Sequence, residues 1–214
     1  MSTIYTRNGK VLKNVTTSKW LAMKEVPVDP YNPLGLPPNT VRVRTSDGNV
    51  PIKGYYTRYE TATLVSGTSD VYDVYMSGTS LSGMFVSSTN VVEVLGANTS
   101  NVTNMESMFS RCSSLSTVPL FDTSRVTNMG SMFYNCSKLT TVPLFDTSSV
   151  TDMSWMFGGC TYVQSGALAL YQQASTQTNP PSSHNSTFSN CGRDTTTGAA
   201  ELAQIPSSWG GTGA

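Results

Sequence analysis

The chain has 214 residues, which is enough for one large domain or two small ones with a real hydrophobic core. Lys and Arg (13) balance Asp and Glu (13), so the formal charge is zero. This balance argues against the basic surface of a protein that binds nucleic acid or anionic membranes. Charged residues make up 12% of the chain whereas Ser and Thr number 59, so we expect a surface of hydroxyl and amide groups.

The N-terminal segment, residues 1–38, is predicted to be an extended arm. The stretch IYTRNGKVL at 4–12 places Asn-Gly between two short apolar runs, which is typical of a β-hairpin. Prolines break regular structure between Pro27 and Pro38. We expect no signal peptide, because the start of the chain has no apolar core and no lipid-attachment cysteine. We also expect no membrane span, because no stretch approaches 18 apolar residues.

Residues 39–77 are predicted to form a β-rich cap. VRVR at 41–44 precedes an Asp47-Gly48 turn, and YETATLV and VYDVYM continue the β-rich pattern. Such strands would cover the open N-terminal end of the repeats that follow, because an uncovered edge invites aggregation.

A 24-residue repeat dominates the middle of the chain. Residues 102–125 and 126–149 are identical at 18 of 24 positions, a weaker copy begins at Gly78, and a further copy begins at Val150. The pair Met-Phe recurs in the same register at 84–85, 108–109, 132–133 and 156–157. A period of this length is typical of repeat architectures whose units bury their apolar faces only when stacked.

Each repeat is predicted to contain a two-turn helix followed by a strand. The helix half carries apolar residues at i, i+3, i+4 and i+7, as in Met129, Met132, Phe133 and Cys136. Thr103 and Glu106 fit a capping box that opens the equivalent helix. The strand half follows L-x-x-L-x-L, as in Leu139, Val142 and Leu144. The predicted fold is therefore α/β, a short right-handed leucine-rich-repeat-like solenoid of 24-residue coils spanning 78–191.

The last coil is predicted to carry an insertion, residues 164–186. It contains an amphipathic pattern at 166–175 that predicts a helix, and a Phe-x-x-Cys signature returns at Phe188 and Cys191. Residues 192–214 are expected to be a C-terminal cap and tail, in which AELAQIPSSW supplies a closing strand.

The repeat motif VTNM-x-x-MF-x-x-C-x-x-L-x-x-V-x-LFDTS resembles the BspA-like leucine-rich-repeat and DUF285 family, found in bacterial surface proteins and in phage genomes. The resemblance covers residues 74–163 and, less closely, the tail to Trp209. EVLGANTSNVTNM and AELAQIPSSW also resemble modules of gut bacteriophage virion proteins. The resemblance implies a surface-exposed protein, and the missing signal peptide favours a virion component over a secreted bacterial one.

Residues that could carry chemistry have simpler structural interpretations. Four cysteines share one register position and are expected to be core thiols, together with the phenylalanines of the same ladder: Cys112, Cys136, Cys160, Cys191, Phe109, Phe133 and Phe157. Zinc-type C-x₂₋₄-C pairs are missing. Asp122 and Asp146 could line a calcium ladder, but Asx turns are the favoured interpretation. His184, in a polar loop, is expected to be solvated. We expect neither cofactor nor enzymatic activity.

The best binding candidates are aromatic and basic residues at positions that vary between repeats: Tyr134, Trp155, Tyr162, Arg111 and Lys138. Exposed aromatic side chains can stack on sugars or anchor a protein partner, although Trp155 and Tyr162 could instead simply cover the coil beside the insertion.

The predicted function is a non-enzymatic virion structural protein, capsid- or tail-associated, assembled in a bacterial cytoplasm. It would attach to other virion proteins through residues 1–38, form a homo-oligomer, and contact a host glycan or protein. The alternatives are a bacterial cell-surface adhesin and a carbohydrate-active enzyme with an unrecognised site.

Overall fold

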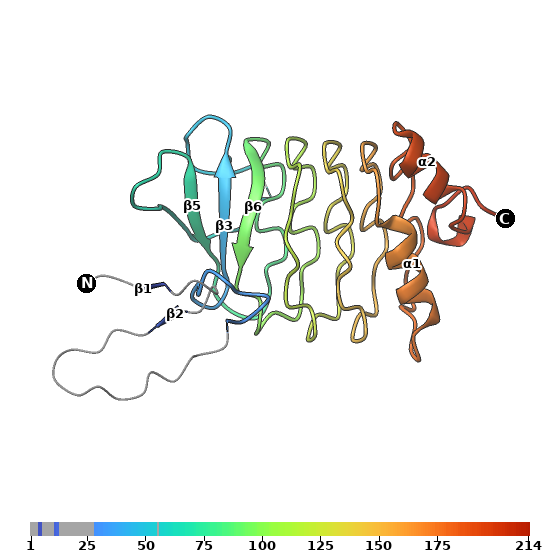
Figure 1. The fold of residues 1–214 in the computed structure, drawn as a ribbon, viewed down its shortest axis with the longest axis horizontal. Coiled ribbons are helices and arrows are strands. Elements are labelled where there is room, and N and C mark those ends of the chain that lie inside the picture. Colours follow the sequence, from blue (N-terminus) through green and yellow to red (C-terminus); the bar gives the residue numbers. More distant parts are fainter. Residues whose placement is uncertain (1–3, 6–10, 13–27, 55) are drawn as a thin grey trace.

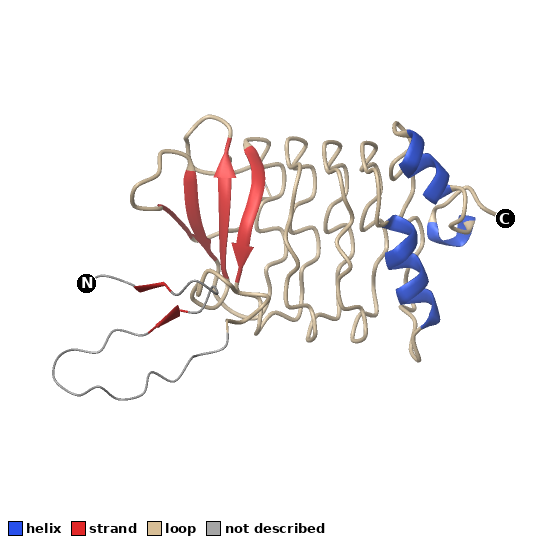
Figure 2. Cartoon of the chain, viewed as in Figure 1, coloured by secondary structure: helices blue, strands red, loops and turns tan. Residues whose placement is uncertain are grey.

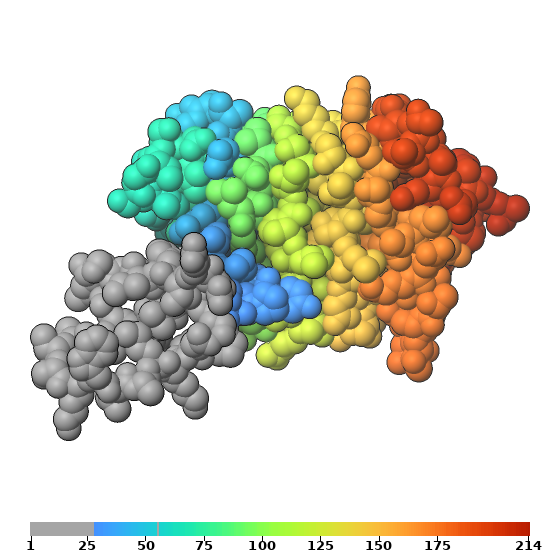
Figure 3. All heavy atoms as spheres, viewed as in Figure 1, coloured from blue at the N-terminus to red at the C-terminus, as the bar shows by residue number. Residues whose placement is uncertain are grey.

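The computed structural model describes residues 4–5, 11–12, 28–54 and 56–214. Their order in space follows their order in the sequence: an antiparallel sheet, then a row of stacked repeats, then a helical C-terminal part (Figures 1 and 2). In the space-filling view the repeats appear as consecutive bands between the sheet and the C-terminal helices (Figure 3).

The sheet contains four antiparallel strands in the order β4-β5-β3-β6. These are β3 (Thr40–Thr45), β4 (Thr61–Leu64), β5 (Val71–Tyr75) and β6 (Val91–Ala97). The strands predicted within 39–77 are thus present as β3, β4 and β5, whereas β6 lies inside the first repeat.

Alternation of side chains gives the sheet one apolar and one charged face. Val41 and Val43 of β3 are fully buried. Arg42, between them, points the other way, and its Nε and Nη2 donate to the two carboxylate oxygens of Asp73 at 2.6 and 2.7 Å. The pair lies across neighbouring strands, because Arg42 is in register with Asp73 of β5.

The predicted N-terminal hairpin is present. Strands β1 (Ile4–Tyr5) and β2 (Val11–Leu12) pair antiparallel, with Ile4 opposite Leu12. The Asn-Gly turn itself and residues 13–27 lie outside the described residues, so most of the proposed arm is not placed.

The repeats stack with their backbones in parallel register. Isolated parallel bridges join equivalent residues of successive repeats: Ser80 to Asn104, Asn104 to Asn128, Asn128 to Asp152 and Asp152 to Ser183. Strand β6 connects the sheet to this stack, because it pairs with β3 on one side while Glu93 bridges Thr117 of the next repeat on the other. The sheet and the stack therefore share one hydrophobic core.

The predicted α/β leucine-rich-repeat-like solenoid is wrong. Regular structure in the described chain consists of the antiparallel strands, two short α-helices and one 3₁₀ helix. The helices α1 (Ala167–Thr176), α2 (Thr196–Leu202) and η1 (Ser207–Trp209) all follow the repeats. Apart from strand β6, residues 78–165 contain turns and isolated bridges in place of the predicted helices.

Left-handed residues prevent helix formation in the repeats. Ser107 and Arg111 have φ of 54° and 61°, and the equivalent Ser131 and Asn135 have φ of 55° and 58°. An α-helix cannot pass through such residues. The backbone instead alternates: Met108 N–H donates to Met105 O within a turn (3.1 Å), and Phe109 N–H donates to Met132 O of the next repeat (2.8 Å). The apolar spacing that suggested a helix is produced by successive tight turns.

The predicted helix cap fails together with the helix. The predicted capping box is missing: Glu106 N–H bonds to Asn104 Oδ1 at 2.8 Å, and the Thr103 hydroxyl donates to Thr79 O of the preceding repeat at 3.2 Å.

The predicted strand half also has a different inward face. Val142 is buried, but Leu144 is 52% exposed and Phe145 is fully buried in its place. Phe145 N–H donates to Pro143 O at 3.0 Å, a γ-type turn that breaks the alternation.

The core of the stack consists of columns of identical side chains. One column of phenylalanines contains Phe85, Phe109, Phe133, Phe157 and Phe188, and its first three rings lie 5.1 and 5.5 Å apart with planes 4° from parallel. A second, shorter column pairs Phe121 with Phe145 at 5.5 Å. Close packing of equal shapes explains why these positions are identical between repeats.

The C-terminal part confirms one prediction and corrects another. The helix predicted at 166–175 is present as α1, and the chain rejoins the stack where Asp152 bridges Ser183. The stretch AELAQIPSSW, predicted to be a strand, contains the end of α2 and η1 instead. Trp209 of η1 packs on Phe188, with ring centroids 6.5 Å apart, and so covers the last repeat.

Candidate binding groove

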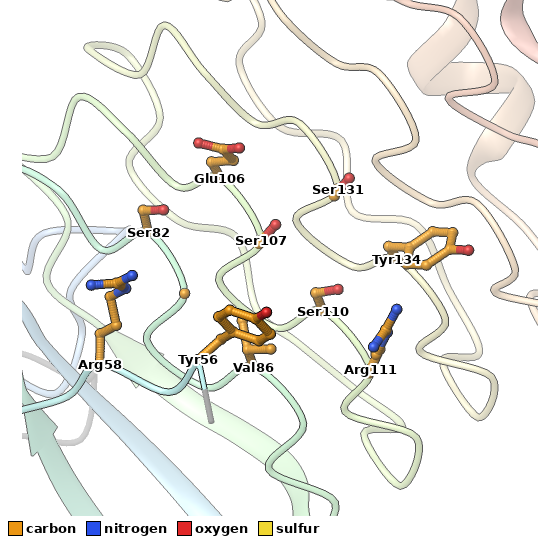
Figure 4. A pocket seen from close by; sticks show the side chains of 11 residues that line it. Tyr56, Arg58, Ser82, Val86, Glu106, Ser107, Ser110, Arg111, Ser131 and Tyr134 are labelled. Carbon is orange, nitrogen blue, oxygen red and sulfur yellow. The ribbon is translucent and has the colours of Figure 1, made fainter. Parts of the chain in front are cut away.

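An open groove lies where the loop before β4 meets the first repeats (Figure 4). Its volume is about 480 Å³. Most of its lining side chains are polar or aromatic: Tyr56, Arg58, Ser82, Glu106, Ser107, Ser110, Arg111, Ser131 and Tyr134. We call this surface the polar groove.

The turns of the repeats position the serines of the polar groove. Ser107 and Ser131 occupy equivalent left-handed corners, and each N–H bonds to the next repeat, to Gly130 O at 2.9 Å and Ser154 O at 2.8 Å. Hydrogen bonds between repeats therefore hold both corners in the groove wall.

Two guanidinium groups are available to a ligand. Arg58 and Arg111 are exposed, and among the described residues neither side chain has a hydrogen-bond or ion-pair partner. They stand at different ends of the groove, with Arg111 next to Tyr134 (Figure 4). Glu106 adds a carboxylate to the lining. An arginine presents several donors in a fixed plane, which suits carboxylate, phosphate and vicinal hydroxyl groups.

Aromatic rings flank the Arg111 end of the groove. Tyr134 is half-buried, and its ring meets that of Trp155 edge to face, with centroids 5.8 Å apart and planes at 90°. Trp155 is 41% exposed and extends this aromatic surface beyond the groove lining. This contact restricts the motion of both rings, so less side-chain entropy is lost when a ligand binds against them.

The structure brings together some of the predicted binding residues. Arg111 and Tyr134 line the polar groove and Trp155 lies beside it, whereas Tyr162 and Lys138 are exposed outside its lining. Tyr56 and Arg58 escaped the sequence analysis because they precede β4, in a segment with no repeat to mark a variable position. Glu106 could have been identified from the sequence, because its position varies between repeats and is Gly130 in the next one.

The cysteines form a buried column of free thiols: Cys112, Cys136, Cys160 and Cys191. The Cys136 thiol donates to Phe109 O at 3.1 Å, and the Cys160 thiol donates to Phe133 O at 3.0 Å. Burial raises the pKa of the Cys160 thiol to about 12, so it stays protonated and unreactive near neutral pH.

The acidic ladder is engaged in backbone turns. Asp122 Oδ1 accepts from Ser124 N–H at 3.2 Å and Asp146 Oδ1 accepts from Ser148 N–H at 2.9 Å, which are the predicted Asx turns. In the part of the chain that the structure describes, no group of three or more His, Cys, Asp or Glu side chains is placed to hold a metal ion.

His184 is not the solvated side chain that the sequence suggested. Its ring stacks on Trp209, with centroids 4.2 Å apart and planes 7° from parallel, and Nδ1 is buried. The stacking attaches the loop before the last repeat to η1, so the residue has a clear packing role.

The chain is thus a repeat protein with an open polar groove. The family model described as "Mycoplasma protein of unknown function, DUF285" matches residues 75–192, more than half of the chain. The protein belongs to the DUF285 family. No curated protein and no solved structure matches the chain. None of the helices in the described residues has the length and apolarity needed to cross a bilayer.

Proposed function

We propose that this protein is a non-enzymatic binding protein whose polar groove contacts a carbohydrate on a bacterial surface. The observation that carries the proposal is the meeting of Arg111, Tyr134 and a row of serines in one open groove. Sugars combine apolar C–H faces with hydroxyl edges. An aromatic ring can cover the former, while hydroxyl and guanidinium groups can hydrogen-bond the latter.

The composition of the polar groove favours binding over catalysis. Glycoside hydrolases use a pair of carboxylates a defined distance apart. Glu106 is the single carboxylate among the groove-lining residues that the structure describes. The thiols, which could be nucleophiles elsewhere, are buried and held protonated. We therefore propose retention of a glycan without turnover.

We further propose that the protein is a structural component of a bacteriophage virion, capsid- or tail-associated and assembled in the bacterial cytoplasm. The resemblance of EVLGANTSNVTNM and AELAQIPSSW to virion modules supports this placement, with residues 1–38 attaching to other virion proteins. Many copies on one particle would convert weak sugar contacts into firm attachment. The second candidate is a bacterial cell-surface adhesin. The BspA-like resemblance and the family's description as a Mycoplasma protein favour this candidate.

Binding is tested with the full chain on an array of bacterial surface glycans, followed by titration of any glycan retained. Tyr134→Ala and Arg111→Ala are expected to weaken binding at least tenfold, about 1.4 kcal/mol or more. Tyr162→Ala is the matched control, because it removes an exposed aromatic ring outside the groove. Equal binding by all three variants, or an array on which the wild type retains nothing, contradicts the carbohydrate proposal.

Location is tested by mass spectrometry of purified phage particles. Stoichiometric recovery, at a copy number that fits a symmetric position, supports a virion component. Recovery from bacterial cell envelopes with none in particles moves the assignment to the adhesin.

A further inference from the structure

Strand β4 is an open edge of the sheet. It pairs with β5 on one side, and none of the described residues pairs with its other side. The opposite end of the sheet is different, because β6 continues into the repeats through the bridge from Glu93 to Thr117. An open edge presents unpaired N–H and C=O groups that can pair with another strand.

The hydrogen-bond pattern identifies the groups that point outward. Val65 N–H donates to Val71 O at 2.9 Å, so the backbone N–H and C=O of Val65 point toward β5. In an antiparallel pair the direction of the backbone groups alternates from residue to residue. The N–H and C=O of Thr61 and Thr63 therefore also point toward β5, and those of Ala62 and Leu64 point outward. Glu60 N–H points inward as well, to Tyr75 O, so the outward stretch begins at Ala62.

The edge lacks the features that usually prevent strand pairing. Thr61–Leu64 contains neither a charge nor a proline. The neighbouring charges already have partners: the carboxylate of Glu60 accepts from the N–H and hydroxyl of Ser77, and Asp73, opposite Thr63 on β5, is paired with Arg42. A second neutral strand could therefore approach without electrostatic repulsion.

The apolar side of the sheet also runs out to this edge. Ala62 packs against the hydrophobic core. Leu64, two residues further on, shares that face and is 47% exposed. The core thus ends in a half-exposed leucine beside the outward backbone groups.

We propose that β4 pairs antiparallel with β4 of a second copy of this chain, centred on Thr63. In this register Leu64 lies opposite Ala62 of the second copy, and both pairs exchange N–H···O bonds because their backbone groups face outward. Each Leu64 then extends the core of one copy toward that of the other. A second copy is the fitting occupant because a two-fold contact needs only one surface that complements itself. The resulting dimer contains one continuous sheet and two polar grooves.

The first test measures the molar mass of the full chain by sedimentation equilibrium over a range of concentrations. We expect a dimer whose dissociation constant rises at least tenfold in Leu64→Lys. Leu144→Lys is the matched control, because it adds the same charge at a leucine of similar exposure in the repeats, and it should leave the dimer intact. A wild-type monomer at every concentration, or an equal effect of both variants, overturns the proposal.

The second test traps the register. Thr63→Cys places two thiols directly opposite each other at a non-hydrogen-bonded pair, where the spacing suits a disulfide. Mild oxidation should yield a covalent dimer, and Thr61→Cys, which has no symmetric partner, should yield little. The native cysteines are buried and should not compete. Equal cross-linking at both positions overturns the register.

Hydrogen exchange distinguishes a second copy from coverage of the edge by the same chain, for example by the hairpin β1–β2. The amides of Ala62 and Leu64 should become protected as concentration rises. Protection that is the same at all concentrations overturns the proposal.

Discussion

The antiparallel sheet and the stacked repeats bury their apolar side chains in different ways. In the sheet, a strand pairs with strands of unrelated sequence, and alternation along each strand separates buried Val41 and Val43 from Arg42. In the repeats, each residue lies beside its own copy 24 residues away, as Phe109 lies beside Phe133. Sheet positions therefore need only suitable polarity, whereas stacked positions need matching shape, which explains the identity between repeats.

The largest expected effect comes from breaking a column. Phe133→Ala removes a ring that stacks on both Phe109 and Phe157, and should lower the free energy of unfolding by about 3–5 kcal/mol. Urea denaturation followed by circular dichroism measures the loss. Leu144→Ala, at an exposed position of the same repeat, is the control and should change stability by less than about 0.5 kcal/mol. Similar losses in the two variants would show that the column does not carry the stack.

The thiol column predicts a loss of stability in alkali. Burial raises the pKa of Cys160 in the folded chain to about 12 from the ordinary 9.0. Its contribution to the free energy of unfolding is therefore fully present below pH 9 and is lost as the pH rises toward 12. In that window the Cys160 thiol lowers the unfolding free energy by about 1.4 kcal/mol per pH unit, because it ionises in the unfolded chain and stays protonated in the folded one.

Unfolding free energies of the wild type and of Cys160→Ala between pH 8 and pH 10.5 measure this effect, and the variant should show the shallower slope. Parallel slopes would mean that the thiol is not buried as the structure describes.

The smallest effect concerns the left-handed corners, a feature that the strands of the sheet lack. Ser131, with φ of 55°, should be improved by glycine, which adopts this conformation without steric cost. Ser131→Gly is expected to gain about 0.5–1 kcal/mol.

Ser137→Gly, at a position without positive φ, should instead lose a similar amount, because glycine only adds freedom to the unfolded chain there. Thermal unfolding of the two variants tests the opposite signs. A loss in both would show that the corner at Ser131 is not strained.

Sequence patterns were reliable where one local signal determined one structure. The hairpin at 4–12, the strands within 39–77 and the helix α1 follow from turn residues, alternation and amphipathic spacing. The helix assigned to each repeat failed because Met129, Met132, Phe133 and Cys136 have helical spacing but bury the same faces through successive turns. The polar groove was found only in part, because Tyr56 and Arg58 reach it from a loop distant in sequence.

The sequence by itself determined the 24-residue period, the cysteine column, the longer phenylalanine column and the family, because identical side chains must pack on identical neighbours. Only the tertiary structure decided that the repeats consist of left-handed corners, that Phe145 rather than Leu144 faces inward, and that β6 belongs to both the sheet and the stack. The double role of β6 depends on its pairing with β3 and its bridge to Thr117, and the burial of Phe145 depends on the turn that its N–H closes with Pro143 O. The left-handed corners depend on hydrogen bonds between repeats. Such bonds make a turn with positive φ more stable than an isolated two-turn helix, which is too short to persist alone.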